Sequence, residues 1–551
     1  MDTQRLILLF IFGFSVLMLW EAWQKETRPA PQPPAQVSQT KDALPKPAAS
    51  AATPETAATT APGVPGAAAA AKGETVRVRT DLVVAEIDTL GGTLKRLELL
   101  KHKDAADPNK DFVLLGPEHH YEAQSGITRE GGPNHLSLWK AQGTDFALEN
   151  GKDSVEVRLS AVGKDGIAVD KVYTLRRNSY VIDVSLDVKN RGQAPAGLYA
   201  YFQLTHDGKE AGDHNTLAQS FGARSFSGFA TYNADKHFEK ISSSDVDKAK
   251  VERHADNGWL AFVQHYFVSA WLIPDKTPRD YNVLKRADGT YAGNAVVQLP
   301  TLQPGGEARA SASLYAGPQE QSRLKGAAPG LDLVVDYGWL TIIAWPLFWL
   351  LQKFHELSGN WGVAIILLTV LIKVVFFPLS AASYKSMAKM KLITPRLTKI
   401  RETYGHDRQK MNQAMMELYK TEKINPLGGC FPIVVQIPVF IALYWTLLAA
   451  IELRHAPFML WIKDLSALDP YYVLPILMTA TMVLQTRMNP TPPDPVQAKV
   501  MQVMPFVFSI FFFFFPAGLV LYWLVNNILS ILQQWQIQRM FNRDRPAHAK
   551  R

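Results

Sequence analysis

The 551-residue sequence lacks several features that mark common functional classes. It contains one cysteine, Cys430, so no disulfide can form within the chain. The phosphate-binding pattern GxxxxGK[ST], the zinc-protease pattern HExxH and the nucleophile pattern GxSxG are absent. The sequence therefore shows no means of hydrolysing a nucleotide. We expect no catalytic residue, no cofactor and no small-molecule substrate.

Histidines are frequent in the middle of the chain, but their spacing is not that of metal ligands. His119 and His120 are adjacent, and adjacent residues of a strand point to opposite faces of a sheet. We interpret these histidines as surface and packing residues, so no metal site is predicted. The others considered are His206, His214, His237, His254 and His265.

Apolar residues make up 47% of the chain but are unevenly distributed. They concentrate at residues 6–20 and beyond residue 337, which is typical of a membrane protein with a soluble middle part. Arg5 precedes the first run, and no small-residue cleavage site follows it. We predict an N-terminal transmembrane anchor at 1–24, with a cleaved signal peptide as the alternative. Residues 25–73 are rich in Pro and Ala and are predicted to form an extended linker.

Residues 74–330 show a hydrophobic period of two, which indicates a large antiparallel all-β domain. Residues 75–79 alternate, and residues 180–189 place five apolar side chains on one face. We predict two packed sheets. Turns are expected at residues 91–92, 150–151, 165–166 and 288–289, where glycine follows Gly, Asn or Asp.

Residues 361–379 are almost wholly apolar and match the roughly 20 residues that cross a bilayer. Lys373 interrupts them, and a charge near the bilayer centre costs at least about 2.5–3.5 kcal/mol. Thr369 lies one turn earlier on the same helical face. Two interpretations are open: the amine extends to the inner headgroups, or it faces a polar cavity inside the protein.

The charge pattern predicts the direction of this span. Residues 381–424 carry ten basic residues against four acidic ones, and the positive-inside rule places such a segment in the cytoplasm. If residues 331–357 also crossed the membrane, the span at 361–379 would run outward and the basic segment would lie outside. Residues 331–357 are therefore predicted to lie along the outer interface as an amphipathic helix. The tail, residues 539–551, is also basic and is predicted to be cytoplasmic. The core, residues 358–538, is expected to contain five spans at about 361–379, 431–451, 471–487, 503–515 and 519–535.

Residues 381–404 and 407–423 show apolar residues at helical spacing and predict a cytoplasmic helical hairpin. Its apolar faces are rich in methionine, a side chain that adapts to varied apolar partners. The alternative is that these methionines hold the two helices together. The residues predicted to contact such apolar partners are Met387, Met390, Met411 and Met415.

Uncharged polar residues recur inside the other predicted spans. Such groups should face one another or a water-filled cavity, because polar groups facing lipid are costly. The alternative is that they join helices by hydrogen bonds worth roughly 0.6–2 kcal/mol each. The residues that stand out beside Thr369 and Lys373 are Gln436, Gln485, Tyr522 and Asn526.

Six segments give the sequence a specific resemblance. They are NPLGGCFP at 425–432, QIP at 436–438, APF at 456–458, WIKDLS at 461–466, DPYY at 469–472 and FPAGLVLYW at 515–523. Together they closely resemble the YidC membrane protein insertases, the bacterial branch of the Oxa-type family. The N-terminal MDTQR and the large exported β domain resemble the Gram-negative form.

The resemblance implies a fold and a set of groove residues. It implies five core helices around a hydrophilic groove, and a β domain similar to the β-super-sandwich of sugar mutarotases. Lys373 matches a groove position that is usually arginine in bacterial relatives, and Thr369 matches a second groove position. Tyr522 and Trp523 match a client-contacting aromatic pair that is often Tyr-Tyr. Lysine keeps the charge but loses the bidentate fork of arginine.

The sequence therefore predicts a multi-pass protein of the bacterial inner membrane, with its large domain in the periplasm and its tail in the cytoplasm. It would act as a membrane protein insertase and chaperone, alone or with the Sec translocon. Expected partners are nascent membrane proteins, the ribosome and signal recognition particle pathway, and membrane lipids. A transporter or channel that uses Lys373 as its ion or substrate site is the main alternative, and a membrane-anchored sugar enzyme is a third.

Overall fold

The computed structural model describes residues 73–543 except 105–106, 130, 210–225, 423–430 and 490–494. The predicted N-terminal anchor, nearly all of the predicted linker, the motif residues 425–430 and the end of the tail lie outside the described residues. The described chain forms two compact units, which divide between Val335 and Asp336. Each unit is described by itself.

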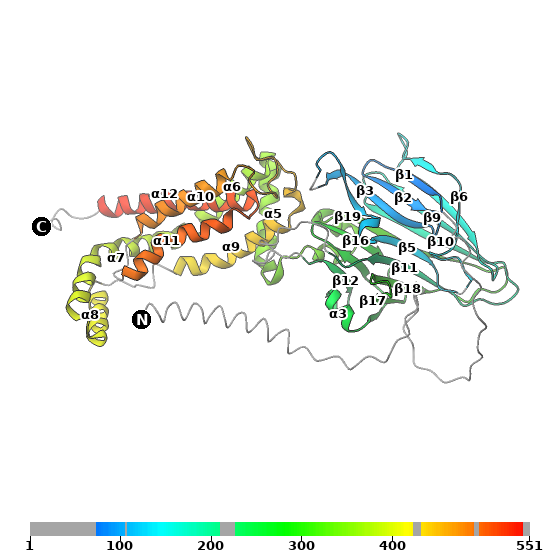
Figure 1. Ribbon diagram of the computed structural model, residues 1–551, viewed down its shortest axis with the longest axis horizontal. Coiled ribbons are helices and arrows are strands. Elements are labelled where there is room, and N and C mark those ends of the chain that lie inside the picture. The colour runs from blue at the N-terminus through cyan, green and yellow to red at the C-terminus, as the bar shows by residue number, and fades with distance from the viewer. Residues whose placement is uncertain are drawn as a thin grey trace. The chain divides into compact units, whose positions relative to one another are not determined.

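The first unit consists of two β-sheets packed as a sandwich (Figure 1). The ten-stranded sheet has the order β14-β17-β18-β11-β5-β3-β2-β1-β7, with β4 paired to β3. Its strands are β1 (Thr75–Arg79), β2 (Val83–Asp88), β3 (Thr93–Lys103), β4 (Asp111–Leu115), β5 (Glu122–Ile127), β7 (Asp145–Ala147), β11 (Tyr199–His206), β14 (Val251–Ala255), β17 (Arg279–Lys285) and β18 (Tyr291–Gln298).

The nine-stranded sheet has the order β13-β12-β15-β16-β19-β10-β9-β8-β6. Its strands are β6 (Lys140–Ala141), β8 (Ser154–Val162), β9 (Ile167–Arg176), β10 (Val181–Asn190), β12 (Gly228–Asn233), β13 (His237–Ile241), β15 (Trp259–Val263), β16 (Phe267–Leu272) and β19 (Glu307–Pro318). Short helices α3 (Ser243–Lys248) and α4 (Gln321–Ala327) complete the unit.

The alternation seen in the sequence produces this sandwich directly. In β10, Ile182, Val184 and Leu186 are buried while the residues between them are partly exposed. The interior faces of the two sheets thus come from every second residue. The predicted all-β domain of two packed sheets is confirmed.

Lys171 is an exception, because it lies on the interior face of β9 and is fully buried. Its ammonium donates to the carbonyls of Gly91, Gly92 and Ser125 on the opposite sheet, at 3.0, 3.0 and 2.8 Å. It also lies 4.4 Å from the centroid of the Trp139 ring, a cation–π contact. Gly92 has a φ of 53°, and a Cβ there would lie 3.1 Å from the ammonium. The predicted Gly91-Gly92 turn is therefore where the two sheets are joined by a buried cation.

Burial lowers the pKa of Lys171 from its ordinary value of 10.5 to about 7. Between pH 7 and 10.5 the unfolded chain therefore binds more protons than the folded chain, and stability rises with pH in that window. The slope for one group is at most about 1.4 kcal/mol per pH unit. We predict that Lys171→Met removes this slope, measured as the pH dependence of denaturant unfolding of the β sandwich in the full-length protein.

Lys189→Met is the matched control, since Lys189 lies on the neighbouring strand β10 and its ammonium pairs with the exposed Glu307. This variant should retain the slope. An equal pH slope in the wild-type protein and in Lys171→Met would contradict the prediction.

The second unit is helical (Figure 1). Helices α6, α9, α10, α11 and α12 run lengthwise, α5 lies across one end, and α7 and α8 form a hairpin at the other. In this unit α12 packs against α6, α9 and α10, α10 packs against α11, and α5 packs against α6 and α9. The helices are α5 (Thr341–Ser358), α6 (Trp361–Val375), α7 (Phe377–Tyr404), α8 (Arg408–Thr421), α9 (Phe431–Ala449), α10 (Val473–Met488), α11 (Pro495–Phe512) and α12 (Ala517–Arg543).

The predicted span at 361–379 is not one continuous helix. Helix α6 ends at Val375, and Phe376 leaves helical geometry with φ −88° and ψ 6°. Helix α7 then starts at Phe377 with Pro378 in its first turn. Proline has no N–H and cannot continue the preceding helix, so the break falls there. In the described part of the chain no single helix is both apolar and long enough to cross a membrane, whereas α6 and α7 satisfy both criteria together across a 66° bend.

Other helix boundaries also differ from the predicted spans. Helix α11 begins eight residues before the predicted span at 503–515 and ends at Phe512, and α12 continues past residue 535 to Arg543. The prediction followed apolar residues only, whereas polar turns continue both helices. Helix α5 buries Phe348 and Leu351 on one face, and it runs unbroken through Pro346.

Candidate functional site

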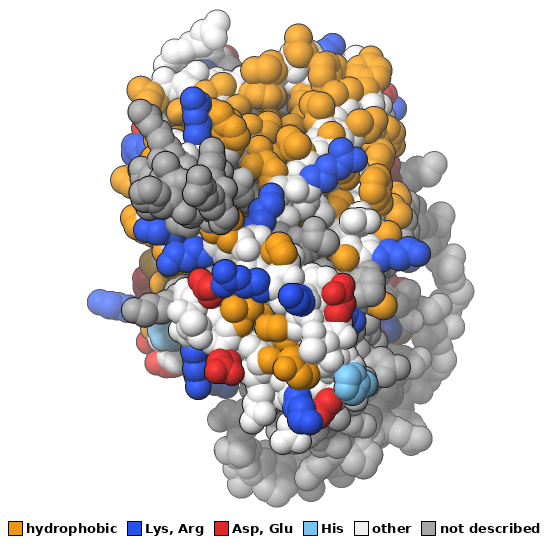
Figure 2. Space-filling view, turned by 90° about the vertical axis from the view of Figure 1, so that its left-hand side faces the viewer, with side chains coloured by type: hydrophobic (Ala, Val, Ile, Leu, Met, Phe, Trp, Pro, Cys, Tyr) orange, Lys and Arg blue, Asp and Glu red, His pale blue; other side chains and the backbone are white. Residues whose placement is uncertain are grey.

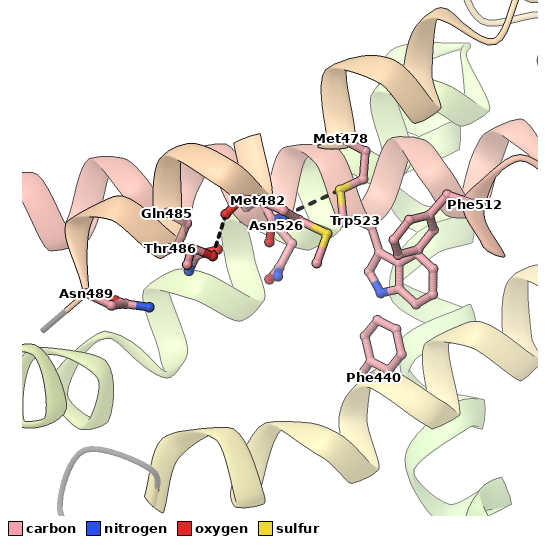
Figure 3. Close-up of a pocket in the computed structure, with 10 residues that line it drawn as sticks. Phe440, Met478, Met482, Gln485, Thr486, Asn489, Phe512, Trp523 and Asn526 are labelled. Atoms are coloured by element: carbon pink, nitrogen blue, oxygen red, sulfur yellow. Dashed lines mark hydrogen bonds between the residues drawn. The ribbon is translucent and has the colours of Figure 1, made fainter. Parts of the chain in front are cut away.

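A cavity of about 250 Å³ lies between four helices of the helical unit (Figure 3). Figure 3 shows aromatic rings at one end of it and amide and hydroxyl groups toward the other. One end of the cavity is therefore apolar, and the other is polar. Its lining residues are Phe440 on α9, Met478, Met482, Gln485 and Thr486 on α10, Asn489 directly after α10, Phe512 on α11, and Trp523, Asn526 and Asn527 on α12.

The aromatic end is built around Trp523. Its ring stacks on Phe440, with centroids 4.8 Å apart and planes 3° apart. Phe512 meets the same indole edge-on, at 4.2 Å and 83°. Both arrangements suit the ring quadrupoles, and together they hold the Trp523 side chain in the cavity wall.

The polar end is held by amide pairs between helices. Gln436 donates through Nε2 to Oδ1 of Asn526 at 3.2 Å, which links α9 to α12. Gln534 donates through Nε2 to Oδ1 of Asn489 at 3.1 Å, which links α12 to α10. These two hydrogen bonds connect α9, α12 and α10 beside the amides of Gln485 and Asn526, which line the cavity.

Lys373 lies behind this wall and is 6% exposed. Its ammonium donates to the Ser530 hydroxyl at 2.7 Å, and this hydroxyl donates to the backbone carbonyl of Asn526, also at 2.7 Å. Gln533 donates to the Lys373 carbonyl at 3.3 Å. The cation is thus one hydroxyl away from a residue of the cavity wall. The amine points to α12 and is bonded within the helix packing.

Thr369 and Tyr522 are buried in the helix packing rather than in the cavity wall. Thr369 is 1% exposed, and its hydroxyl donates to the carbonyl of Ile365 one turn earlier at 2.7 Å. Tyr522 is also 1% exposed, and its ring lies 5.9 Å from that of Phe440. Of the seven predicted groove residues, the cavity brings together Gln485, Trp523 and Asn526, with Gln436 bonded to the last.

The prediction missed most of the α10 wall. Met478, Met482, Gln485, Thr486 and Asn489 recur at three- and four-residue intervals along one helical face. That spacing is visible in the sequence and extends the polar position that Gln485 already marked. Phe440 and Phe512 carry no such signal, since their place beside Trp523 depends on tertiary packing.

The hairpin of α7 and α8 separates its methionines into two groups. Met390 and Met415 pack against the buried Ile393 and Leu397, so these two hold the hairpin together. Met416, which the prediction omitted, is 55% exposed. The other two predicted residues, Met387 and Met411, are half-buried.

Figure 2 shows this end of the helical unit, where Lys and Arg side chains gather beside apolar ones. The exposed basic residues of the hairpin are Lys385, Lys391, Arg396, Lys399, Lys410 and Lys420. Arg396 pairs with Glu422 at 2.5 Å. Within the described ranges, no group of three or more His, Cys, Asp or Glu side chains is arranged to hold a metal ion.

Comparisons with known proteins agree along both units. Residues 75–350 match the family model described as YidC periplasmic domain, and residues 353–544 match the one described as 60Kd inner membrane protein. The chain is 51% identical over 549 residues to the membrane protein insertase YidC of Methylobacillus flagellatus, with 98% of each chain covered.

A second relative gives the same result. The membrane protein insertase YidC of Nitrosospira multiformis is 50% identical over 559 residues, covering 98% of this chain and 97% of that one. These relatives are named for insertion rather than for a catalysed reaction, and the matched families describe an inner-membrane protein with a periplasmic domain. The chain belongs to the YidC family of membrane protein insertases.

Proposed function

We propose that the cavity between α9, α10, α11 and α12 receives part of a nascent membrane protein during insertion. The observation that carries this proposal is the pairing of an aromatic end with an amide end in one cavity. An apolar client segment packs on rings such as Trp523, while polar backbone and side chains near it bond to Gln485 and Asn526. No covalent bond is made or broken.

The outer surface of the same bundle supports insertion into lipid. Large apolar side chains are exposed along α11, where Val503 is 49%, Phe506 56% and Ile510 62% exposed. An exposed apolar surface of this kind suits contact with acyl chains. A client segment that leaves the cavity sideways transfers its own apolar surface to lipid, which supplies the driving force at roughly 25 cal/mol per Å².

Lys373 gives the site its charge. Its ammonium is bonded to a neutral hydroxyl, and that hydroxyl bonds to the backbone of Asn526 in the cavity wall. A positive charge in a low-dielectric bundle attracts acidic residues of a client tail more strongly than it would in water. Lys373 thereby lowers the cost for such a tail of entering the membrane, and Thr369 and Tyr522 support this region by packing.

The arrangement in the membrane follows from the charges. Residues 1–24 anchor the chain, residues 25–73 link the anchor to the periplasmic domain at 74–330, and α5 lies along the outer interface. The bundle crosses five times, and the basic hairpin and the tail at 539–551 face the cytoplasm. This multi-pass topology puts the polar end of the cavity within reach of cytoplasmic water.

The hairpin makes the first contact with clients. Its exposed Lys and Arg side chains suit an anionic partner, such as ribosomal RNA or lipid headgroups. Met416 offers an exposed, adaptable apolar group beside them. Clients arrive from the ribosome and signal recognition particle pathway, and the protein works alone or beside the Sec translocon.

Reconstitution tests the role of Lys373. The purified protein in liposomes should insert a single-span client with an acidic exported tail, without added nucleotide. Lys373→Arg keeps the charge and should retain most insertion, whereas Lys373→Glu should reduce it at least about tenfold, because a carboxylate repels the tail. Normal insertion by both variants would remove the charge role. Solute flux without insertion would instead indicate a transporter or channel.

The hairpin methionines provide a matched pair of variants. Met416→Ser removes an exposed contact, so it should weaken cross-linking of clients to the hairpin without lowering the melting temperature. Met415→Ser places a hydroxyl against the buried core of the hairpin and should lower hairpin stability by roughly 1–3 kcal/mol. Thermal unfolding and client cross-linking measure the two effects. Equal effects of both variants on cross-linking would contradict a direct contact by Met416.

A further inference from the structure

Three helices of the helical unit begin beside one loop, residues 450–472, which connects α9 to α10. At the start of α6, Asn360 accepts a hydrogen bond from the N–H of Val363 at 3.1 Å and so caps the helix. The amide of Asn360 also donates to the loop carbonyls of Pro457 and Phe458, at 3.2 and 2.9 Å. The loop is therefore attached to the first turn of α6.

The same loop supplies the acceptors for the start of α12. The N–H of Ala517 donates to the carbonyl of Ala467 at 2.7 Å, and the N–H of Gly518 donates to the carbonyl of Leu465 at 2.8 Å. These N–H groups lie in the first turn, where a helix provides no partner of its own. Loop carbonyls thus satisfy them.

At the start of α10 the loop uses a carboxylate. Tyr472 occupies the N-cap position with a φ of 55°, and its side chain makes no capping bond. Asp469, three residues earlier, accepts instead from the N–H of Leu474 at 2.7 Å. Its other oxygen accepts from the N–H of Tyr471 at 3.1 Å and from Nε1 of Trp461 at 2.9 Å.

Asp469 is 2% exposed, and three N–H donors satisfy its carboxylate. A buried carboxylate held in this way is sensitive to change, because loss of one acceptor oxygen leaves buried N–H groups without a partner. Two of these donors, Trp461 and Tyr471, belong to the loop, and the third, the N–H of Leu474, lies in the first turn of α10. The carboxylate therefore fixes the position of α10 relative to the loop, and through the loop relative to α6 and α12.

Helix α10 and Asn489, which directly follows it, also provide half of the lining residues of the cavity, including Gln485 and Thr486 at its polar end. The facing side chain, Asn526, comes from α12. The distance between Asn526 and the α10 side chains depends on where α10 and α12 begin. Residues 450–472 bond to the first turns of both helices.

We propose that Asp469 is a positioning residue for insertion, holding the α10 wall of the cavity against α12 and α6. This inference rests on the proposed function only in assigning the cavity to the client. The position of α10 itself can be measured without a client.

Asp464 provides a matched control in the same loop. Its carboxylate lies 3.0 Å from Nδ1 of His455 and accepts from the N–H and hydroxyl of Ser466, with no bond to α10. Asp464→Asn and Asp469→Asn make the same chemical change within six residues of each other. A general effect of altering the loop charge would appear in both.

The test uses the full-length protein in liposomes, with Cys430→Ser and a reporter cysteine from Gln485→Cys. Alkylation of this cysteine by a water-soluble maleimide reports the exposure of the α10 wall. Asp469→Asn should raise the alkylation rate at least about tenfold, the effect of losing a charge-assisted hydrogen bond on local opening. Asp464→Asn should change the rate by less than about twofold. Insertion of the single-span client is measured in protein that retains Gln485, where it should fall with Asp469→Asn and not with Asp464→Asn.

An unchanged alkylation rate in Asp469→Asn would overturn the positioning role. A raised rate with normal insertion would leave that role intact and overturn the assignment of the cavity to the client. If Asp469→Asn does not fold, Trp461→Phe decides the matter, because it removes one donor and leaves the other two. It should raise the alkylation rate in the same direction by a smaller factor, and an unchanged rate would count against the proposal.

Discussion

A polar group inside a helix bundle that faces lipid has to find its partner within the protein. The helical unit meets this constraint in several places, while among the described residues the buried hydroxyls of Tyr444 and Tyr522 have no hydrogen-bond partner. The first-turn N–H groups of α10 and α12 bond to residues 450–472, and Asn360 caps α6. The amides of Gln436 and Asn526 bond to each other across two helices. Under the proposed function, a client bonds to the short stretch of polar side chains that line the cavity.

The same constraint explains why Lys373 can be tolerated. A cation within an apolar bundle is costly, and its attachment to Ser530 offsets part of the cost. The charge therefore lies two hydrogen bonds behind Asn526, through the Ser530 hydroxyl, rather than on the cavity surface. Under the proposed function, the charge acts on a client tail through its field rather than through a direct hydrogen bond. Lysine suffices for such a role, where a bidentate contact would require arginine.

The interior of the β sandwich also contains charged groups that need hydrogen-bond partners within the protein. Its interior contains the ammonium of Lys171, bonded to three carbonyls, and the guanidinium of Arg279, which donates to several others. Both cations satisfy backbone oxygens that the sheets leave free. In each unit, hydrogen bonds from a buried lysine therefore connect elements that are distant in the sequence.

Local patterns predicted much of this architecture. The alternation in β10 and the helical spacing in α7 and α8 depend on neighbouring residues, and both predictions hold. The burial of Lys171 was not predictable, since its partners Gly91 and Ser125 are 80 and 46 residues away. Thr369 shares a helical face with Lys373, but sequence spacing does not show that its hydroxyl is already bonded to Ile365. The cavity was predicted best where a polar residue interrupts an apolar helix, as at Gln485 and Asn526.

The alternation of polar and lipid-facing residues on α12 allows a direct test of the cavity. A photo-cross-linking residue at Asn526 faces the cavity, while one at Ile528, which is 41% exposed, lies outside its lining on the same helix. With a client arrested during insertion, the account predicts strong cross-linking from position 526 and little from position 528. Equal cross-linking from both positions, or none from position 526, would contradict it.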